Sequence, residues 1–378
     1  MTAHAKLSAS GSARWINCPG SVRAEEGFPD STSIFAEEGT MAHELAQRVL
    51  EYGGSAFDYE GIGVPEGNVA LVPPEMCAYI QEYVDYVDRI DLACANDNSN
   101  LLIEHRVDFS PWVPDGFGTC DTIVLDDGHL HIIDLKYGKG VPVYAQDNTQ
   151  GILYALGAYN ELNQIYGFET VTIHIVQPRL DSVSDWTLSV DELLAWGERI
   201  SQAAQATQDP DAERIPSEKA CQWCKAKAVC PALLAKTEAV LMSEFDDLDP
   251  VNPDQLTDEQ IVTVLDNKKL IVAWLGAVEE HVTEKLKSGE DFVGYKLVAG
   301  RSNRAWGNED TAAVVLAEVL GEDAFTRKII SVAAAEKKLG KGKAGKLEGL
   351  VVKPEGSPTL VSASDPRPAV NVSAASFD

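Results

Sequence analysis

The stretch Gly118-Thr-Cys-Asp-Thr-Ile-Val-Leu-Asp-Asp-Gly-His-Leu-His-Ile-Ile-Asp-Leu-Lys136 decides the fold. Apolar residues alternate on both sides of Asp127-Gly128, a dipeptide typical of two-residue hairpin turns. If these two residues form the turn, residues equally far from it lie opposite each other, and Asp121 faces Asp134. Lys136 shares their face, because side chains alternate along a strand. The sequence therefore predicts a hairpin with two carboxylates and a lysine on one face.

Two carboxylates opposite each other on an apolar strand face are unfavourable, because they repel each other and lose hydration. A divalent cation between them would reverse this, since hard cations prefer oxygen ligands. The alternative is a different turn, which would change the register and leave both aspartates as solvated strand ends.

The segments around this hairpin predict an α/β fold. Helical and alternating apolar spacings predict, in chain order, a helix over 33–52, a helix over 75–95, strands over 101–107, 119–125 and 129–136, a helix over 146–164 and a strand over 171–177. Such an order favours a mixed sheet flanked by helices. Beyond it, the pattern predicts helices over 255–288 and 309–340 and a short strand pair over 292–306.

The chain divides into three predicted regions. Residues 1–240 form the α/β domain, residues 255–353 form a mostly helical C-terminal region, and the Ser- and Pro-rich residues 354–378 form a tail. An acidic, Pro-bearing segment near 244–253 marks the first boundary.

Composition favours a globular protein in the cytoplasm. Of the 378 residues, 45% are hydrophobic, but no apolar run approaches the roughly 20 residues that span a bilayer. No apolar signal segment follows the first residues. The net charge of −28 counts against a nucleic-acid partner, although binding depends on a local patch rather than on the total.

Four short motifs together resemble a known family. They are Gly39-Thr-Met-Ala-His43-Glu44, Gly118-Thr-Cys-Asp121, Ile133-Asp134-Leu-Lys136 and Gln150-Gly-Ile-Leu-Tyr154. Their order and spacing resemble the RecB-type branch of the PD-(D/E)XK nucleases. Similar motifs occur in the AddB nuclease domain, in CRISPR-adaptation nucleases and in a group of phage and prophage proteins that matches nearly the whole chain.

This resemblance implies roles for named residues. Asp121, Asp134 and the Leu135 carbonyl would ligate Mg²⁺ or Mn²⁺, and Lys136 would orient the attacking water. His43 would be a further metal ligand; its alternative is an ordinary surface or core histidine. Two more residues would position the substrate and the site, Gln150 and Tyr154.

Glu104, on the strand beside the hairpin, is a further candidate carboxylate ligand. Its alternative is a solvated strand residue.

The cysteines suggest a second metal centre. Cys221, Cys224 and Cys230 supply three thiolates in a short stretch, and Cys18, directly before Pro19-Gly20, is the candidate fourth. The spacing leaves Zn²⁺, a [4Fe–4S] cluster and four unliganded thiols open. The one-plus-three arrangement resembles the iron–sulfur members of the family, which favours the cluster.

The implied activity is DNA phosphodiester hydrolysis, exonucleolytic at ends or on single strands, in phage recombination or DNA processing. A helicase or recombinase partner would fit this role. The alternatives are a catalytically silent DNA-binding scaffold and a zinc-stabilised binding module.

A basic stretch offers a DNA contact in this acidic chain. Residues 327–353 hold eight basic and two acidic residues, including Lys341, Lys343 and Lys346 in a glycine-rich run. These lysines would contact the DNA backbone; the alternative is a solvated charge run.

Overall fold

The computed structural model describes residues 5–29, 34–63, 71–94, 100–242 and 258–297. The chain forms two compact units, Met1–Ser288 and Gly289–Asp378. In the second unit only residues 289–297 are described, and they form turns without a strand. The rest of the predicted strand pair, the predicted helix over 309–340, the lysines at 341, 343 and 346 and the predicted tail lie outside the described residues.

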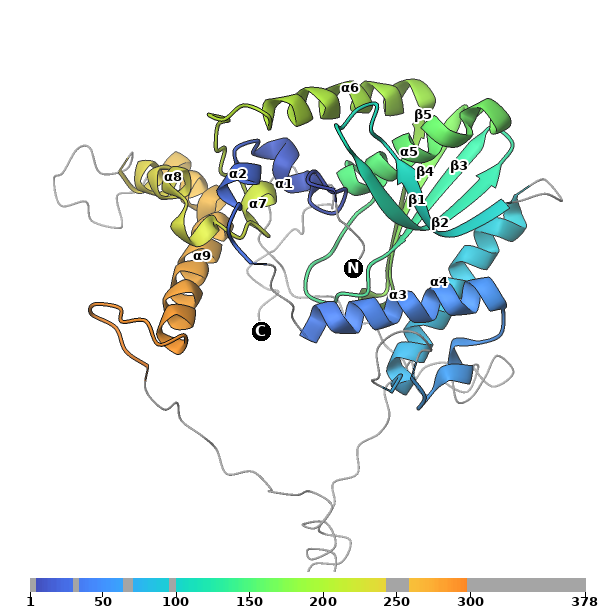
Figure 1. The fold of residues 1–378 in the computed structure, drawn as a ribbon, viewed down its shortest axis with the longest axis horizontal. Helices are drawn as coiled ribbons and strands as arrows, with labels where there is room; N and C mark the ends of the chain where they lie inside the picture. Colours follow the sequence, from blue (N-terminus) through green and yellow to red (C-terminus); the bar gives the residue numbers. More distant parts are fainter. Residues whose placement is uncertain (1–4, 30–33, 64–70, 95–99, 243–257, 298–378) are drawn as a thin grey trace, which may run out of the picture. The chain divides into compact units, whose positions relative to one another are not determined.

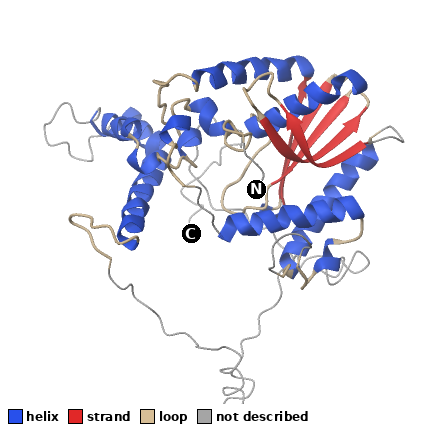
Figure 2. Ribbon diagram, viewed as in Figure 1, coloured by secondary structure: helices blue, strands red, loops and turns tan. Residues whose placement is uncertain are grey.

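The first unit contains a five-stranded mixed sheet (Figure 2). Its strands are β1 (Asn100–Asp108), β2 (Phe117–Asp126), β3 (His129–Leu135), β4 (Thr170–Gln177) and β5 (Ser182–Ser189). They lie in chain order; β3 and β4 are parallel, and the other neighbours are antiparallel. A parallel pair needs a crossover connection, which helix α5 (Thr149–Tyr166) provides. The predicted α/β class with a mixed sheet is confirmed.

The β2–β3 hairpin has the predicted register. Gly128 in its turn has a φ of +73°, a left-handed conformation that glycine adopts without steric cost. In each pair of the ladder, the two residues are equally far in sequence from this turn. The last pair is Thr122 opposite Ile133. Asp121 and Asp134 are the next residues at its open end.

Helices cover both faces of the sheet (Figure 1). Helices α5 and α6 (Val190–Ala206) share a core with Ile123 and Ile132. On the other face, α3 (Ile34–Tyr52) and α4 (Pro74–Ala93) share a core with Val124 and Ile133. Adjacent strand residues thus enter opposite cores, which is the alternation expected of a sheet buried on both sides. The helices predicted over 33–52, 75–95 and 146–164 are confirmed within a few residues.

The remaining elements lie beside the sheet layers. They are α1 (Ser12–Asn17), α2 (Ser21–Ala24), α7 (Glu218–Cys221), α8 (Pro231–Met242) and α9 (Asp258–Lys287), with 3₁₀ turns η1 (Ala56–Tyr59), η2 (Pro178–Leu180) and η3 (Lys227–Val229). Helix α1 contacts α5, α6 and α7, and α9 contacts α7, α8 and η3. The helix predicted over 255–288 is therefore present as α9 and packs within the first unit.

Strand β5 and helix α6 have no counterpart among the sequence predictions. The residues of β5 are half-exposed or exposed except for the buried Leu188, and its apolar residues do not alternate regularly. Helix α6 does carry a readable signal, because Ser189 and Glu192 form a capping box at its start. Among the described residues, no helix is both long and apolar enough to cross a membrane.

Candidate metal and active site

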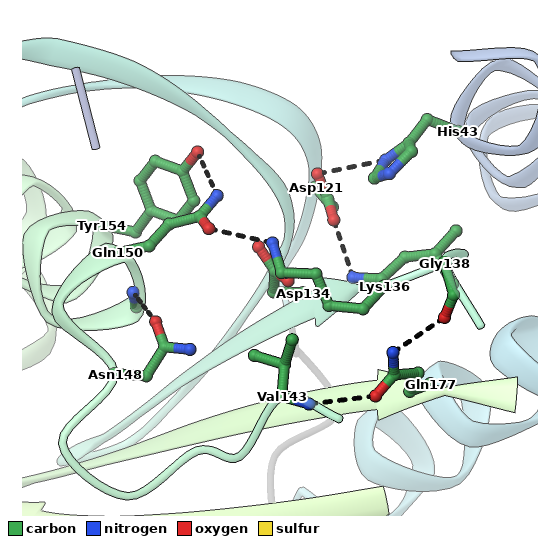
Figure 3. A network of polar contacts seen from close by, with 12 residues as sticks. His43, Asp121, Asp134, Lys136, Gly138, Val143, Asn148, Gln150, Tyr154 and Gln177 are labelled. Carbon is green, nitrogen blue, oxygen red and sulfur yellow. Dashed lines mark hydrogen bonds and ion pairs between the residues drawn. The ribbon is translucent and has the colours of Figure 1, made fainter. Parts of the chain in front are cut away.

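The open end of the β2–β3 hairpin brings the predicted carboxylates together (Figure 3). The Leu135 backbone N–H donates a hydrogen bond of 2.7 Å to Asp121 Oδ2. Asp134 is only 1% exposed, and its Oδ2 lies 2.8 Å from Lys136 Nζ. The predicted grouping of Asp121, Asp134 and Lys136 is thus present. The contact seen for Leu135 uses its N–H rather than the carbonyl predicted as a metal ligand.

His43 reaches this site from helix α3. Its Nδ1 lies 3.3 Å from Asp121 Oδ1. Leu45 and Val49, farther along the same helix, are buried in the core between α3 and the sheet, which fixes the helix that carries His43. The imidazole therefore approaches the carboxylate from a helix packed on the sheet.

Glu104 completes a cluster with metal-binding character. Single ligand atoms of His43, Glu104 and Asp121 all lie within 4.8 Å of one another, and no other such group of three occurs in the described part of the chain. One imidazole and two carboxylates suit Mn²⁺, and the carboxylates suit Mg²⁺. Asp134 lies outside this group of three and contacts Lys136 instead.

The backbone at Glu104 is strained. Its φ is +47°, although it lies in the middle of β1. The β1–β2 ladder pairs the residues on either side but skips Glu104 and, opposite it, Asp121. A left-handed non-glycine residue costs on the order of 1–2 kcal/mol, and such strain concentrates at functional sites. The strain lies beside the carboxylate that contacts His43.

Lys136 begins a polar chain that runs into helix α5. Its Nζ donates to Gln150 Oε1 at 2.9 Å, and Gln150 Nε2 donates to the Tyr154 hydroxyl at 3.1 Å. Gly151 allows this approach, because a Cβ there would lie 2.5 Å from Ile173 Cγ2 on β4. The predicted facing of Gln150 and Tyr154 toward the site is present in this geometry.

The electrostatics of the site follow from burial and crowding. Burial opposes a charge on His43, but the negative Asp121 beside it outweighs this and raises the His43 pKa to about 9. Burial and the charge of Asp121 raise the Glu104 pKa to about 7. Burial also raises the pKa of Asp134, despite Lys136 beside it. Carboxylates therefore outnumber the cations that neutralise them, which is the condition a divalent cation relieves.

One residue near the site carries no sequence prediction. Gln177, 1% exposed at the end of β4, donates to the carbonyls of Gly138 and Val141 at 2.8 and 2.9 Å. Its Oε1 accepts from Val143 N at 3.1 Å. These bonds fix the loop that follows Lys136. A polar side chain at the end of a buried strand is the signal that could have identified it.

The four predicted cysteines line one cavity. Cys18, Cys221, Cys224 and Cys230 all contribute to its wall. The Ile215 N–H donates to Cys18 Sγ at 3.2 Å. Four thiolates on one Zn²⁺ at about 2.3 Å would lie about 3.8 Å apart. No three of these sulfur atoms lie within 4.8 Å of one another.

Two further features of this cavity fit a bound group. The Ser21 hydroxyl lies in its wall, buried and without a hydrogen-bond partner among the described residues. Gly20 packs against the downstream chain so closely that a Cβ would lie 2.4 Å from the Ala212 carbonyl oxygen. Pro19 and Gly20 form a turn in which the Ser21 N–H donates to the Cys18 carbonyl at 2.9 Å, and Cys18 lines the same cavity as the other three cysteines.

A histidine stack lies elsewhere on the sheet, formed by His129, His131 and His174. The rings of His129 and His131 are stacked with centroids 4.1 Å apart. His131 Nδ1 lies 3.0 Å from His174 Nε2, and His174 Nδ1 lies 2.9 Å from the Tyr86 hydroxyl. Burial lowers the pKa of His131 to about 3 and that of His174 to about 4. The stack is therefore neutral, and its hydrogen bonds are made between His131 and His174 and to the uncharged Tyr86 and Thr172.

Comparisons with known proteins give one family. The family model described as "Protein of unknown function (DUF2800)" matches residues 4–368. A solved structure described as "Crystal structure of SSO0001" is 13% identical in sequence and has a TM-score of 0.25. The match covers 58% of this chain and 85% of the other chain. A likeness that low carries no conclusion about fold or activity.

Proposed function

We propose that this chain, which belongs to the DUF2800 family, is a metal-dependent DNA nuclease of the PD-(D/E)XK type. One observation supports this most: the hairpin register brings Asp121, Asp134 and Lys136 to one site. His43 and Glu104 approach the same site from α3 and β1.

The side chains present fit a divalent cation and a phosphodiester. His43, Glu104 and Asp121, with Asp134 and the Leu135 carbonyl, would hold Mg²⁺ or Mn²⁺. When bound, the metal lowers the pKa of a water ligand and neutralises charge on the phosphate.

Lys136 supplies the fixed positive charge of the site. It is held between Asp134 and Gln150, so its ammonium group does not have to reorganise as negative charge grows on the phosphate. Tyr154 orients Gln150 in turn.

The substrate and the biological role rest on the family resemblance. DNA ends or single strands are the proposed substrates, with exonucleolytic cleavage in phage recombination or processing and a helicase or recombinase as partner. The cytoplasm of the host cell is the proposed location. A catalytically silent DNA-binding scaffold is the alternative that the activity assay decides.

We also propose that the four cysteines hold a [4Fe–4S] cluster. The four cysteines line one cavity, and their one-plus-three arrangement along the chain resembles the iron–sulfur members of the family, which favours a cluster over a single Zn²⁺. The Ser21 hydroxyl, which has no hydrogen-bond partner among the described residues, would donate a hydrogen bond to a cluster sulfur.

The test of the activity uses anaerobically purified protein with Mn²⁺ and end-labelled single-stranded, duplex and circular DNA. Wild type should release labelled nucleotides from linear DNA, and Asp134→Asn should not. Cleavage by Asp134→Asn at the wild-type rate would falsify the site. Binding without any cleavage by wild type would establish the scaffold.

The test of the cysteine centre measures iron, sulfide and zinc in the same preparation. Cys221→Ser and Cys18→Ser should lose iron and unfold at lower temperature, since metal binding is coupled to folding. Cys94→Ser is the matched control, because Cys94 lies at the end of α4 and not in the cavity wall. If the protein contained one equivalent of zinc and no iron, the four cysteines would form a zinc site and the cluster proposal would be wrong.

A further inference from the structure

The cysteine segment, defined here as residues 214–236, presents an aromatic ring to solvent. Trp223 lies between Cys221 and Cys224 and is 70% exposed. The segment's basic residues are Arg214, Lys219, Lys225, Lys227 and Lys236. Against these five it holds one acidic residue, Glu218, which gives +4 in a chain whose total is −28. The ring therefore lies in a locally basic part of an acidic protein.

The backbone that carries Trp223 is anchored on both sides. Arg14 Nη1 donates to the Trp223 carbonyl at 3.4 Å, and Arg14 also pairs with Glu25 at 2.9 Å. The Lys225 N–H donates to Glu25 Oε1 at 2.8 Å. A ring on a fixed loop loses little conformational freedom when it binds a partner.

Helix α1 connects this loop to the carboxylate site, the name used here for the cluster of Asp121, Asp134 and Lys136 with His43 and Glu104. Ser12 Oγ on α1 lies 2.7 Å from Thr149 Oγ1, the residue before Gln150. Arg14, on the same short helix, contacts the Trp223 carbonyl. One helix therefore contacts both the α5 residues beside Lys136 and the exposed loop, so their separation is fixed by packed structure.

We propose that Trp223 is a stacking platform for an unpaired base of single-stranded DNA, with lysines of the cysteine segment contacting the adjacent phosphates. An indole ring can stack on any base, and basic residues beside it match a phosphate backbone. The net charge of +4 in this segment, within a chain whose total is −28, favours a polyanion beside the exposed ring. The proposal rests on the proposed function, since it names the strand form that the nuclease holds.

The experiment measures binding of labelled oligo-dT and of a blunt duplex without divalent cations, so that no cleavage occurs. Trp223→Ala should weaken oligo-dT binding roughly 5- to 150-fold, the equivalent of about 1–3 kcal/mol per stacked base. Trp223→Phe keeps an aromatic ring and should retain most of the affinity. Tyr52→Ala, which removes an equally exposed ring (71%) from α3, should change nothing.

Quenching of tryptophan emission by oligo-dT gives an independent reading. Trp223→Phe should bind but lose most of the quenching, which supports the platform even if Trp223→Ala does not fold. Equal oligo-dT affinity in wild type and Trp223→Ala, or equal quenching in wild type and Trp223→Phe, overturns the platform. Either result would indicate that the exposed Trp223 ring binds a protein partner instead of DNA.

The two proposals fail in different ways. A wild type that cleaves DNA with Mn²⁺ while Trp223→Ala binds equally well keeps the nuclease and overturns the platform. A wild type that binds oligo-dT through Trp223 but cleaves nothing keeps the platform and overturns the nuclease. Absence of any oligo-dT binding overturns the platform.

Discussion

Two clusters of ionisable side chains include residues of β3, and burial affects their charges in opposite ways. One cluster keeps its charges and pairs them, whereas the other is neutral. In the carboxylate site, Asp134 is buried beside Lys136, and Asp121 contacts His43. The histidine stack instead gives up its charge, because burial lowers the pKa of its members. A cluster that neutralises itself needs no ligand, whereas one with excess carboxylates favours a cation. This difference, rather than the number of polar residues, is why we propose the carboxylate cluster as the functional site.

The largest expected effect is on cleavage. Lys136→Ala should lower the cleavage rate by a factor on the order of 10³, since it removes the positive charge that we propose stabilises the phosphate. His131→Phe in the histidine stack should leave the rate unchanged. End-labelled DNA with Mn²⁺ provides the measurement.

The control for Lys136→Ala is Lys139→Ala, which removes the same charge from an exposed position three residues along. If both alanine variants lost activity equally, general charge rather than the position of Lys136 would be responsible.

The second effect is on thermal stability. Mn²⁺ at 100 times its Kd should stabilise wild type by about 2.7 kcal/mol, because it binds the folded chain only. Asp121→Asn should lose this gain, and His174→Asn should keep it. Differential scanning calorimetry with and without EDTA measures both. A metal response that disappeared in His174→Asn would place the cation in the histidine stack.

The third effect is a pair of opposite pH dependences in EDTA. His131 binds its proton less well when folded, with a pKa of about 3 against 6.5, so stability falls as the pH drops below about 6.5. The slope reaches at most about 1.4 kcal/mol per pH unit for one histidine. Glu104 binds its proton better when folded, with a pKa of about 7 against 4.5, so its contribution falls as the pH rises through that window.

Urea unfolding between pH 4.5 and 7 separates the two contributions. His131→Phe should flatten the loss of stability toward acid, and Glu104→Gln should steepen it. Parallel profiles for wild type and both variants would contradict the assignment of the two pKa shifts.

The hairpin could be predicted because its information is local. The turn dipeptide and the alternation on both sides determine the register, and the register determines which carboxylates share a face. The approach of His43 and Gln150 depends on helix packing, and it could be anticipated only through a family resemblance. The left-handed backbone of Glu104 has no local signal, because neighbouring strands and the site hold it in place.

Elements at the sheet edge were the ones missed. Strand β5 pairs with β4 along its whole length, but its polar, half-exposed residues resemble a loop when taken alone. Here tertiary pairing outweighs local propensity. Helix α6, by contrast, has a local signal, because the Ser189 and Glu192 capping box marks its start.

The contact between Cys18 and Ile215 also has a consequence for synthesis of the chain. The two residues are 197 positions apart. At roughly 5–20 residues per second, a ribosome needs about 10–40 s to make that interval. Throughout that time Cys18 has been synthesised while its downstream partners do not yet exist. Of the four cysteines, Cys18 is therefore synthesised long before the other three. The cavity that they line can form only after the whole sheet has been translated.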